Sequence, residues 1–163
     1  MTIDTRTTTY ADIREAMLAT LREAFEEVGQ PSAFLDKGDS LFETLEQVSA
    51  TRASIPVGTC GNSIAGQVAH LTFYFDVGFR YMRGENPGPQ DWSAAWRTVD
   101  VSEEEWQALK QGLRERHREL FGIVDAGPPE VTADIMGGMF ALVAHTAYHL
   151  GQIRHALCML PTG

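Results

Sequence analysis

Cysteine is scarce in this sequence, with only two among 163 residues, Cys60 and Cys158. They form no CxxC pair and no disulfide framework, which excludes a cysteine-rich zinc site and a fold held together by disulfides. A reducing cytoplasm is therefore the expected setting. We expect both thiols to be inert, because reactivity requires an electropositive environment that the sequence does not indicate; a reactive thiol is the alternative.

Positive charge and long apolar runs are lacking as well. The 13 Lys and Arg residues stand against 22 Asp and Glu, so the net charge is −9. The basic face that nucleic-acid binding requires is not expected. No unbroken run of 18 apolar residues indicates a membrane-spanning helix, and the Thr-rich N-terminus lacks the apolar segment of a signal peptide. We expect a cytoplasmic protein without membrane or nucleic-acid partners.

Hydrophobic residues recur at steps of three and four, and no strand-like alternation competes with this pattern. Capping residues and Gly or Pro breakers separate the periodic stretches. We predict an all-α fold, a four-helix bundle that forms a single domain over residues 1–163. An additional short helix and a long connection between the second and third core helices, residues 85–101, complete it. The expected core helices are residues 9–28, one from 62 or 63 to 83, one from 102 on, and one from 132 or 133 on.

Two histidines four residues apart, His145 and His149, lie in a proline-free apolar run, residues 135–160. On a helix they project from one face, one turn apart, where two imidazoles can bind one metal ion. Gly138 and Ala141 precede His145 on nearly the same line, so this face has room for a ligand. The alternatives are that the histidines only form hydrogen bonds in the core and that the glycines only allow close helix packing.

A third interior histidine, His70, belongs to the second core helix and has Gly66 and Ser63 upstream on its own face. Taken alone, such a residue is more often a core histidine than a ligand. Three histidines on two helices can nevertheless converge in a bundle core and bind a divalent metal with one position left open. The residue after His145 is Thr146, so the HExxH zinc-protease motif is absent, and no ExxH pair indicates a di-iron site.

Trp92 and Trp96 in the long connection allow two interpretations. They either plug the end of the bundle or line a substrate pocket.

His117 lies in the charged run 114–119, which is typical of a solvated face. We therefore expect His117 to be exposed and not to bind metal.

Two segments resemble the DinB/YfiT-like superfamily of bacterial metal-dependent helical-bundle proteins. They are NSIAGQVAHL at residues 62–71 and HTAYHLGQI at residues 145–153, and the helix order around them matches over nearly the whole chain. The resemblance implies that His70, His145 and His149 are the metal ligands. It also implies a divalent ion, with nickel or zinc favoured and manganese or iron as further candidates, and a homodimer. Family members often have Glu where this chain has Thr146, so a role for that Glu does not transfer.

The resemblance includes S-transferases that use a low-molecular-weight thiol and maleylpyruvate isomerase-like members. Our leading hypothesis is a metal-dependent transferase, isomerase or hydrolase that acts on small molecules, with a thiol co-substrate or metal-activated water. Gln152 and Tyr148 are candidates for orienting a ligand; Tyr148 ranks second because it lies about 100° around the helix from His149. The alternatives are a non-catalytic metal-binding or stress-response protein and a purely structural bundle.

Overall fold

A computed structural model describes residues 7–59, 61–98, 100–128 and 130–161, and within these ranges the chain is helical with no strand. An isolated bridge joins Val57 to Asn62. None of the described helices is long and apolar enough to cross a membrane. The elements in chain order are α1 (Tyr10–Phe25), α2 (Leu41–Glu46), α3 (Ala50–Ala53), α4 (Ile64–Met82), the 3-10 helix η1 (Ala95–Arg97), α5 (Glu103–Ala126) and α6 (Ala133–Met159).

The helices begin where the sequence places capping residues. Thr9, Ser63, Ser102 and Thr132 each accept a hydrogen bond from the backbone N–H three residues on, which satisfies one of the free donors of the first turn. The predicted starts of the four long helices are therefore confirmed. The helix α1 ends at Phe25, three residues before the predicted end, and the short α3 was not predicted.

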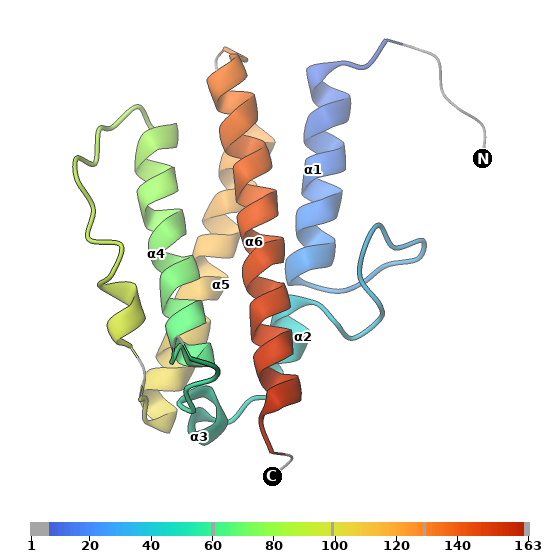
Figure 1. Cartoon of the computed structure of the whole chain (residues 1–163). Coiled ribbons are helices and arrows are strands. Elements are labelled where there is room, and N and C mark those ends of the chain that lie inside the picture. Colours follow the sequence, from blue (N-terminus) through green and yellow to red (C-terminus); the bar gives the residue numbers. More distant parts are fainter. Residues whose placement is uncertain (1–6, 60, 99, 129, 162–163) are drawn as a thin grey trace.

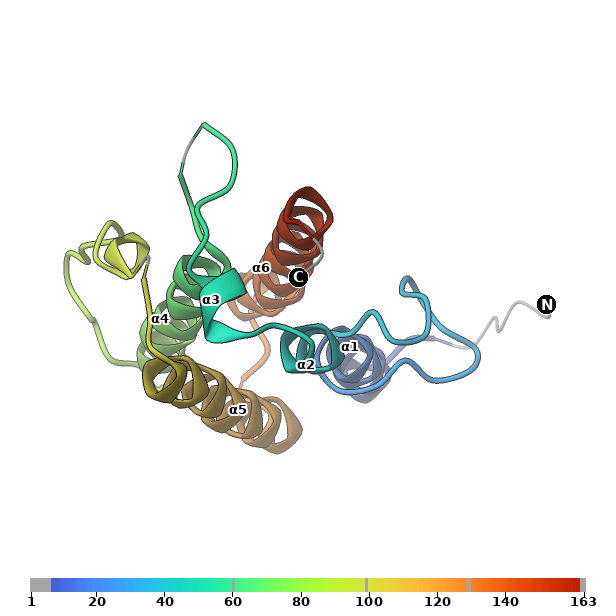
Figure 2. The same cartoon turned by 90° about the horizontal axis from the view of Figure 1, so that it is seen from below.

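The four long helices lie side by side (Figures 1 and 2). The helix α4 packs against α5 and α6, and α1 packs against the same two helices from the other side. Fully buried side chains from all four fill the space between them, among them Leu21, Phe75, Leu120 and Leu150. The connection between α4 and α5 runs back along the outside of α4, and its η1 contacts that helix (Figure 1).

The prediction that His117 is exposed was wrong. Its side chain is buried, with ring centroids 5.0, 5.2 and 4.5 Å from those of Phe25, Phe42 and Phe121. Its Nε2 lies 3.0 Å from a carboxylate oxygen of Glu26. Burial lowers the pKa of His117, although Glu26 opposes the shift. His117 follows Leu113 by four residues and precedes Leu120 by three, so the helical period places it on the buried face of α5, and the charged neighbours of His117 were a misleading signal.

Glu23 of α1 also lies inside. Its carboxylate accepts hydrogen bonds from the backbone N–H groups of Ala33, Phe34 and Leu35 at 2.6 to 2.7 Å. Burial raises its pKa and these three hydrogen bonds lower it, with a net lowering. The carboxylate thus holds the loop after α1 against the helix.

Candidate metal centre

The three predicted histidines converge. His70 comes from α4, and His145 and His149 come from successive turns of α6. The ring centroids are 5.4 Å apart for His70 and His145, 4.8 Å for His70 and His149, and 4.4 Å for the α6 pair. One nitrogen from each ring lies within 4.8 Å of the other two. The rings are close enough to share one ion after small adjustments of the side chains.

His149 is held by Gln67, a residue that the sequence analysis did not assign to the site. Its Nδ1 lies 2.6 Å from Oε1 of Gln67, and both side chains are buried. An amide oxygen only accepts, so Nδ1 donates and the hydrogen-free Nε2 remains for a ligand. Gln67 precedes His70 by three residues and therefore shares its face of α4, which is the one sequence signal that could have identified it.

Two ring nitrogens of the cluster are buried without a hydrogen-bond partner among the described residues, Nδ1 of His70 and Nε2 of His145. Buried polar atoms in folded proteins nearly always have a partner, and an orphaned one is costly. Hydrogen bonds within the described part of the chain therefore do not satisfy these two nitrogens. Three imidazoles that converge from two helices suit a divalent first-row metal, so the residues fit such an ion.

Aromatic rings hold two of the histidines in place. The ring of Tyr74 stacks on His145 at 3.6 Å between centroids and 20° between planes, and Trp96 stacks on His70 at 4.3 Å and 20°. A Cβ on Gly66 would lie 3.0 Å from the carbonyl oxygen of Thr98. Gly66 thus lets the connection approach α4 and place Trp96 over His70. The small residue upstream of His70 therefore makes room for this segment of the connection.

Burial sets the protonation of the cluster. It lowers the pKa of His70, and it lowers the pKa of His145 to about 4 together with the repulsion from His70. Burial, with repulsion from His145 and His70, lowers the pKa of His149 to about 3. All three rings are therefore neutral near pH 7. A neutral imidazole is the form that binds metal, so no proton has to be displaced there.

Two cavities flank the histidines. An apolar cavity of about 480 Å³ lies between the C-terminal half of α4 and the N-terminal half of α6. A more polar one of about 410 Å³ includes His149 itself. The apolar cavity is lined by Tyr74, Val77, Gly78, Trp92, Gly138 and Leu142, among others. The polar one is lined by Asn62, Gln67, Trp96, Tyr148, Gln152 and His155, among others.

The other predicted residues are distributed around these cavities. Gln152 and the exposed Tyr148 both line the polar cavity, and the Tyr148 ring stands at 87° to His149. Trp92 lines the apolar cavity and Trp96 the polar one. Both tryptophans therefore line pockets, and the binding of a substrate there stays a prediction. Gly138 lines the apolar cavity, whereas Ala141 is exposed and lines neither.

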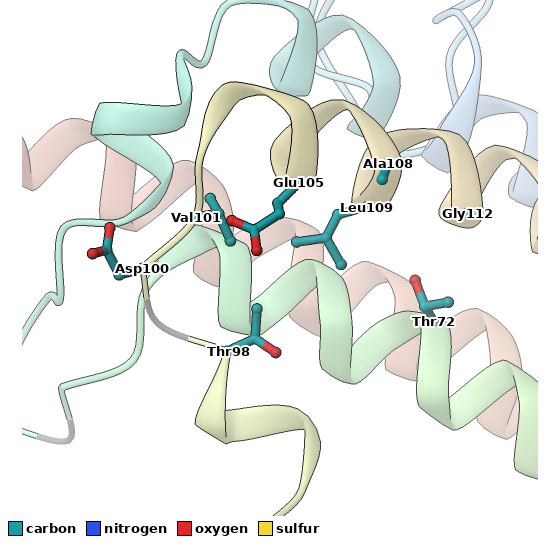
Figure 3. A pocket seen from close by; sticks show the side chains of 8 residues that line it. All are labelled: Thr72, Thr98, Asp100, Val101, Glu105, Ala108, Leu109 and Gly112. Carbon is teal, nitrogen blue, oxygen red and sulfur yellow. The ribbon is translucent and has the colours of Figure 1, made fainter.

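A third cavity, of about 490 Å³, lies between α4, the start of α5 and the end of the connection, and none of the three histidines lines it (Figure 3). Its Glu105 carboxylate accepts hydrogen bonds at the N-terminus of α5 and has a lowered pKa for that reason. Cys158 is free and exposed, and Cys60 lies outside the described residues. We assign no chemistry to this cavity or to the cysteines.

Comparison with protein families gives one result. A sequence model of the DinB superfamily matches residues 33–153, which include all three histidines and Gln67. Comparisons with curated proteins and with solved structures found no significant match.

Proposed function

Because this chain belongs to the DinB superfamily, we propose that it is a divalent-metal-dependent enzyme whose ion is held by His70, His145 and His149. The observation that carries the proposal is the pair of buried, unpartnered ring nitrogens on His70 and His145. A bound ion would satisfy both. Neutral imidazoles suit nickel and zinc best, with manganese and iron as further possibilities.

The bound ion would supply Lewis acidity at an open position, where it lowers the pKa of a coordinated thiol or water. The chain's own residues prepare that position. Gln67 fixes the tautomer of His149 through the 2.6 Å hydrogen bond. Tyr74 and Trp96 stack on the rings of His145 and His70 and fix their orientation. Gln152 and Tyr148, in the polar cavity beside His149, are placed to orient a polar co-substrate.

We favour a low-molecular-weight thiol over water as the nucleophile. Hydrolysis needs a general base within hydrogen-bond reach of the attacking water. Thr146 does not serve, because its hydroxyl donates to the backbone oxygen of Leu142 at 2.8 Å. Among the described residues, Asp134 is the one carboxylate that lines either flanking cavity, and it precedes His145 by 11 residues, about 16 Å along a helix. His155 lines the polar cavity, but it follows His149 by six residues, about 9 Å along the helix. In the transfer, a sulfur–carbon bond forms, the bond from that carbon to the leaving group breaks, and the thiol proton passes to solvent.

The second candidate is a non-catalytic metal-binding or stress-response protein, which would use the same three histidines. A screen separates the two: metal-loaded protein is incubated with glutathione, bacillithiol or mycothiol and a chromogenic aryl chloride, and thioether formation is followed. The enzyme hypothesis predicts metal-dependent turnover with at least one thiol, lost in His149→Ala. Stoichiometric metal binding without turnover for any thiol would favour the binding protein.

We further propose that the protein is a homodimer that associates through α6. Gly137, Ala141, Ala144, Tyr148 and Gly151 recur at steps of four and three along α6, and all are exposed. The 3–4 repeat is that of a helix-packing seam, and its small residues would let a second α6 approach closely.

The remaining proposals concern architecture and location. We interpret the four long helices as a four-helix bundle with one domain over residues 1–163. We place the protein in the cytoplasm, where the free, exposed thiol of Cys158 stays reduced.

A further inference from the structure

The apolar cavity lies next to the candidate metal centre. Tyr74 both lines the cavity and stacks on His145 at 3.6 Å. On α6, Leu142 and Gly138 line the cavity and precede His145 by three and seven residues. These separations correspond to about 5 and 10 Å along the helix. A molecule in the cavity would therefore lie against Tyr74, whose ring stacks on His145, although His145 itself does not line the cavity.

We propose that this cavity is the acceptor subsite of the metal centre and that it takes an uncharged, flat aromatic group. The inference rests on the proposed function, which it extends from a reaction type to a substrate class. The polar cavity on the other side of the cluster would then receive the thiol co-substrate. Each substrate would reach the histidines from its own side.

The shape of the cavity supports an aromatic occupant. The aromatic side chains of Tyr74, Tyr81 and Trp92 form part of its wall, and the volume of about 480 Å³ is typical of small-molecule sites. A Cβ on Gly138 would meet nothing within 4 Å, and one on Gly78 would meet only Leu142 Cδ2, at 4.0 Å. Gly138 therefore does not serve close helix packing, which was the alternative. Gly138 is exposed and leaves this part of the cavity wall open to an occupant.

The charge of the cavity wall supports an uncharged occupant. No Lys, Arg or His lines the cavity in the described part of the chain, and Asp134 is its one acidic residue. A carboxylate that entered would lose its hydration without gaining a basic side chain in the wall and would be repelled by Asp134. The polar cavity instead offers Asn62, Gln152 and His155, which suit the polar groups of a thiol such as glutathione.

Two ligands with one ring system test the polarity. Binding of 2-naphthylmethanol and of 2-naphthoate to metal-free protein is measured by isothermal titration at pH 7.5. We expect the neutral alcohol to bind at least tenfold more tightly than the anion, and Asp134→Asn to reduce this ratio. Equal affinity for both ligands, or tighter binding of naphthoate, would overturn the inference. Because no metal is present, the result does not depend on the metal site.

Two neighbouring glycines provide matched variants that test the location. Gly138→Leu would place a side chain in the cavity, whereas Gly137→Leu would place it on the exposed face, and a Cβ meets nothing within 4 Å at either position. Both substitutions replace a helical glycine by a better helix former, so both variants should fold. We expect Gly138→Leu to weaken binding of 2-naphthylmethanol at least tenfold and Gly137→Leu to change it less than twofold. Equal effects would place the ligand elsewhere.

Cobalt(II)-loaded protein tests the connection to the metal centre. Paramagnetic broadening of the naphthyl proton signals is expected in the cobalt protein and not in the zinc protein, because the ring would lie beside His145. Tight binding of the alcohol without broadening would show an apolar site that is not the acceptor subsite. Failure to load cobalt in the presence of normal alcohol binding would refute the proposed metal function and leave the binding cavity in place.

Discussion

Replacement of Gln67 by leucine should weaken metal binding through His149. Leucine is close to glutamine in size, so the buried site keeps its packing, but it cannot accept the 2.6 Å hydrogen bond from Nδ1. The buried N–H then lacks a partner, which costs about 1–3 kcal/mol. The imidazole can avoid this cost by moving its hydrogen to Nε2. Nε2 must be free of hydrogen to bind the metal, so this tautomer weakens metal binding.

The expected loss of metal affinity is about 10- to 100-fold, the usual effect of removing such a partner from a metal-binding histidine. In free energy this corresponds to about 1.4 to 2.7 kcal/mol. The assay is competition for Zn²⁺ between the metal-free protein and a chromophoric chelator at pH 7.5. Thermal unfolding of the metal-free variant, followed by circular dichroism, shows whether the fold is preserved.

Two further variants make the test specific. Gln67→Glu retains an acceptor for the Nδ1 hydrogen and should keep affinity near the wild-type value. Gln152→Leu changes a glutamine that lines the polar cavity and has no hydrogen bond to the three histidines in the described structure, so affinity should change less than threefold. The reasoning is refuted if Gln67→Leu binds Zn²⁺ as tightly as the wild type, or if Gln152→Leu loses as much.

Four other predictions follow from burial and exposure. Burial lowers the pKa of all three histidines, to about 4 for His145 and about 3 for His149, so protons should displace the metal only below the ordinary histidine value of about 6.5. Metal content should therefore stay constant as the pH falls from 8 to about 6.5 and drop only in stronger acid; release centred near pH 6.5, measured by elemental analysis after dialysis, would contradict this. In the metal-free protein the free energy of unfolding should fall as pH drops from about 6.5 toward 3, because histidines of the unfolded chain, with a pKa of about 6.5, take up protons that the buried ones do not; urea titrations that show no such slope would refute the burial argument. His117→Ala should lower the free energy of unfolding by about 2 to 4 kcal/mol without changing metal content, because a buried side chain is lost. Ala144→Glu should convert the proposed dimer to a monomer of 18.0 kDa in light scattering, because it places a charge on the proposed α6 contact face.

Features that depend on local sequence were predictable. Ser63, Ser102 and Thr132 mark helix starts because a hydroxyl can bond to the backbone N–H three residues later, and the structure confirms all three. The four-residue spacing of His145 and His149 placed them on one face for equally local reasons. His70 joins these two histidines only because α4 packs on α6. The resemblance to a known family implied this arrangement.

Features that depend on contacts between distant segments were not predictable. Gln67 matters only because α4 packs so that its amide meets His149, 82 residues later. The contact of His117 with Phe42 of α2 was not predictable either, although the spacing of His117 from Leu113 and Leu120 does place it on the buried face of α5. The role of Gly66 likewise depends on the path of the connection, which brings Thr98 within reach of α4. Helical periodicity describes one helix at a time and cannot provide such pairings.

The metal content of untagged protein tests the central claim most directly. Elemental analysis of the wild type should give about one divalent ion per chain. His70→Ala, His145→Ala and His149→Ala should each lose most of it while circular dichroism shows that helicity is retained, because alanine favours helices and the buried apolar core is unchanged. A wild type that contains no metal and binds none when Zn²⁺ or Ni²⁺ is added would contradict the account. A histidine variant that keeps full metal content and affinity would remove that residue from the ligand set.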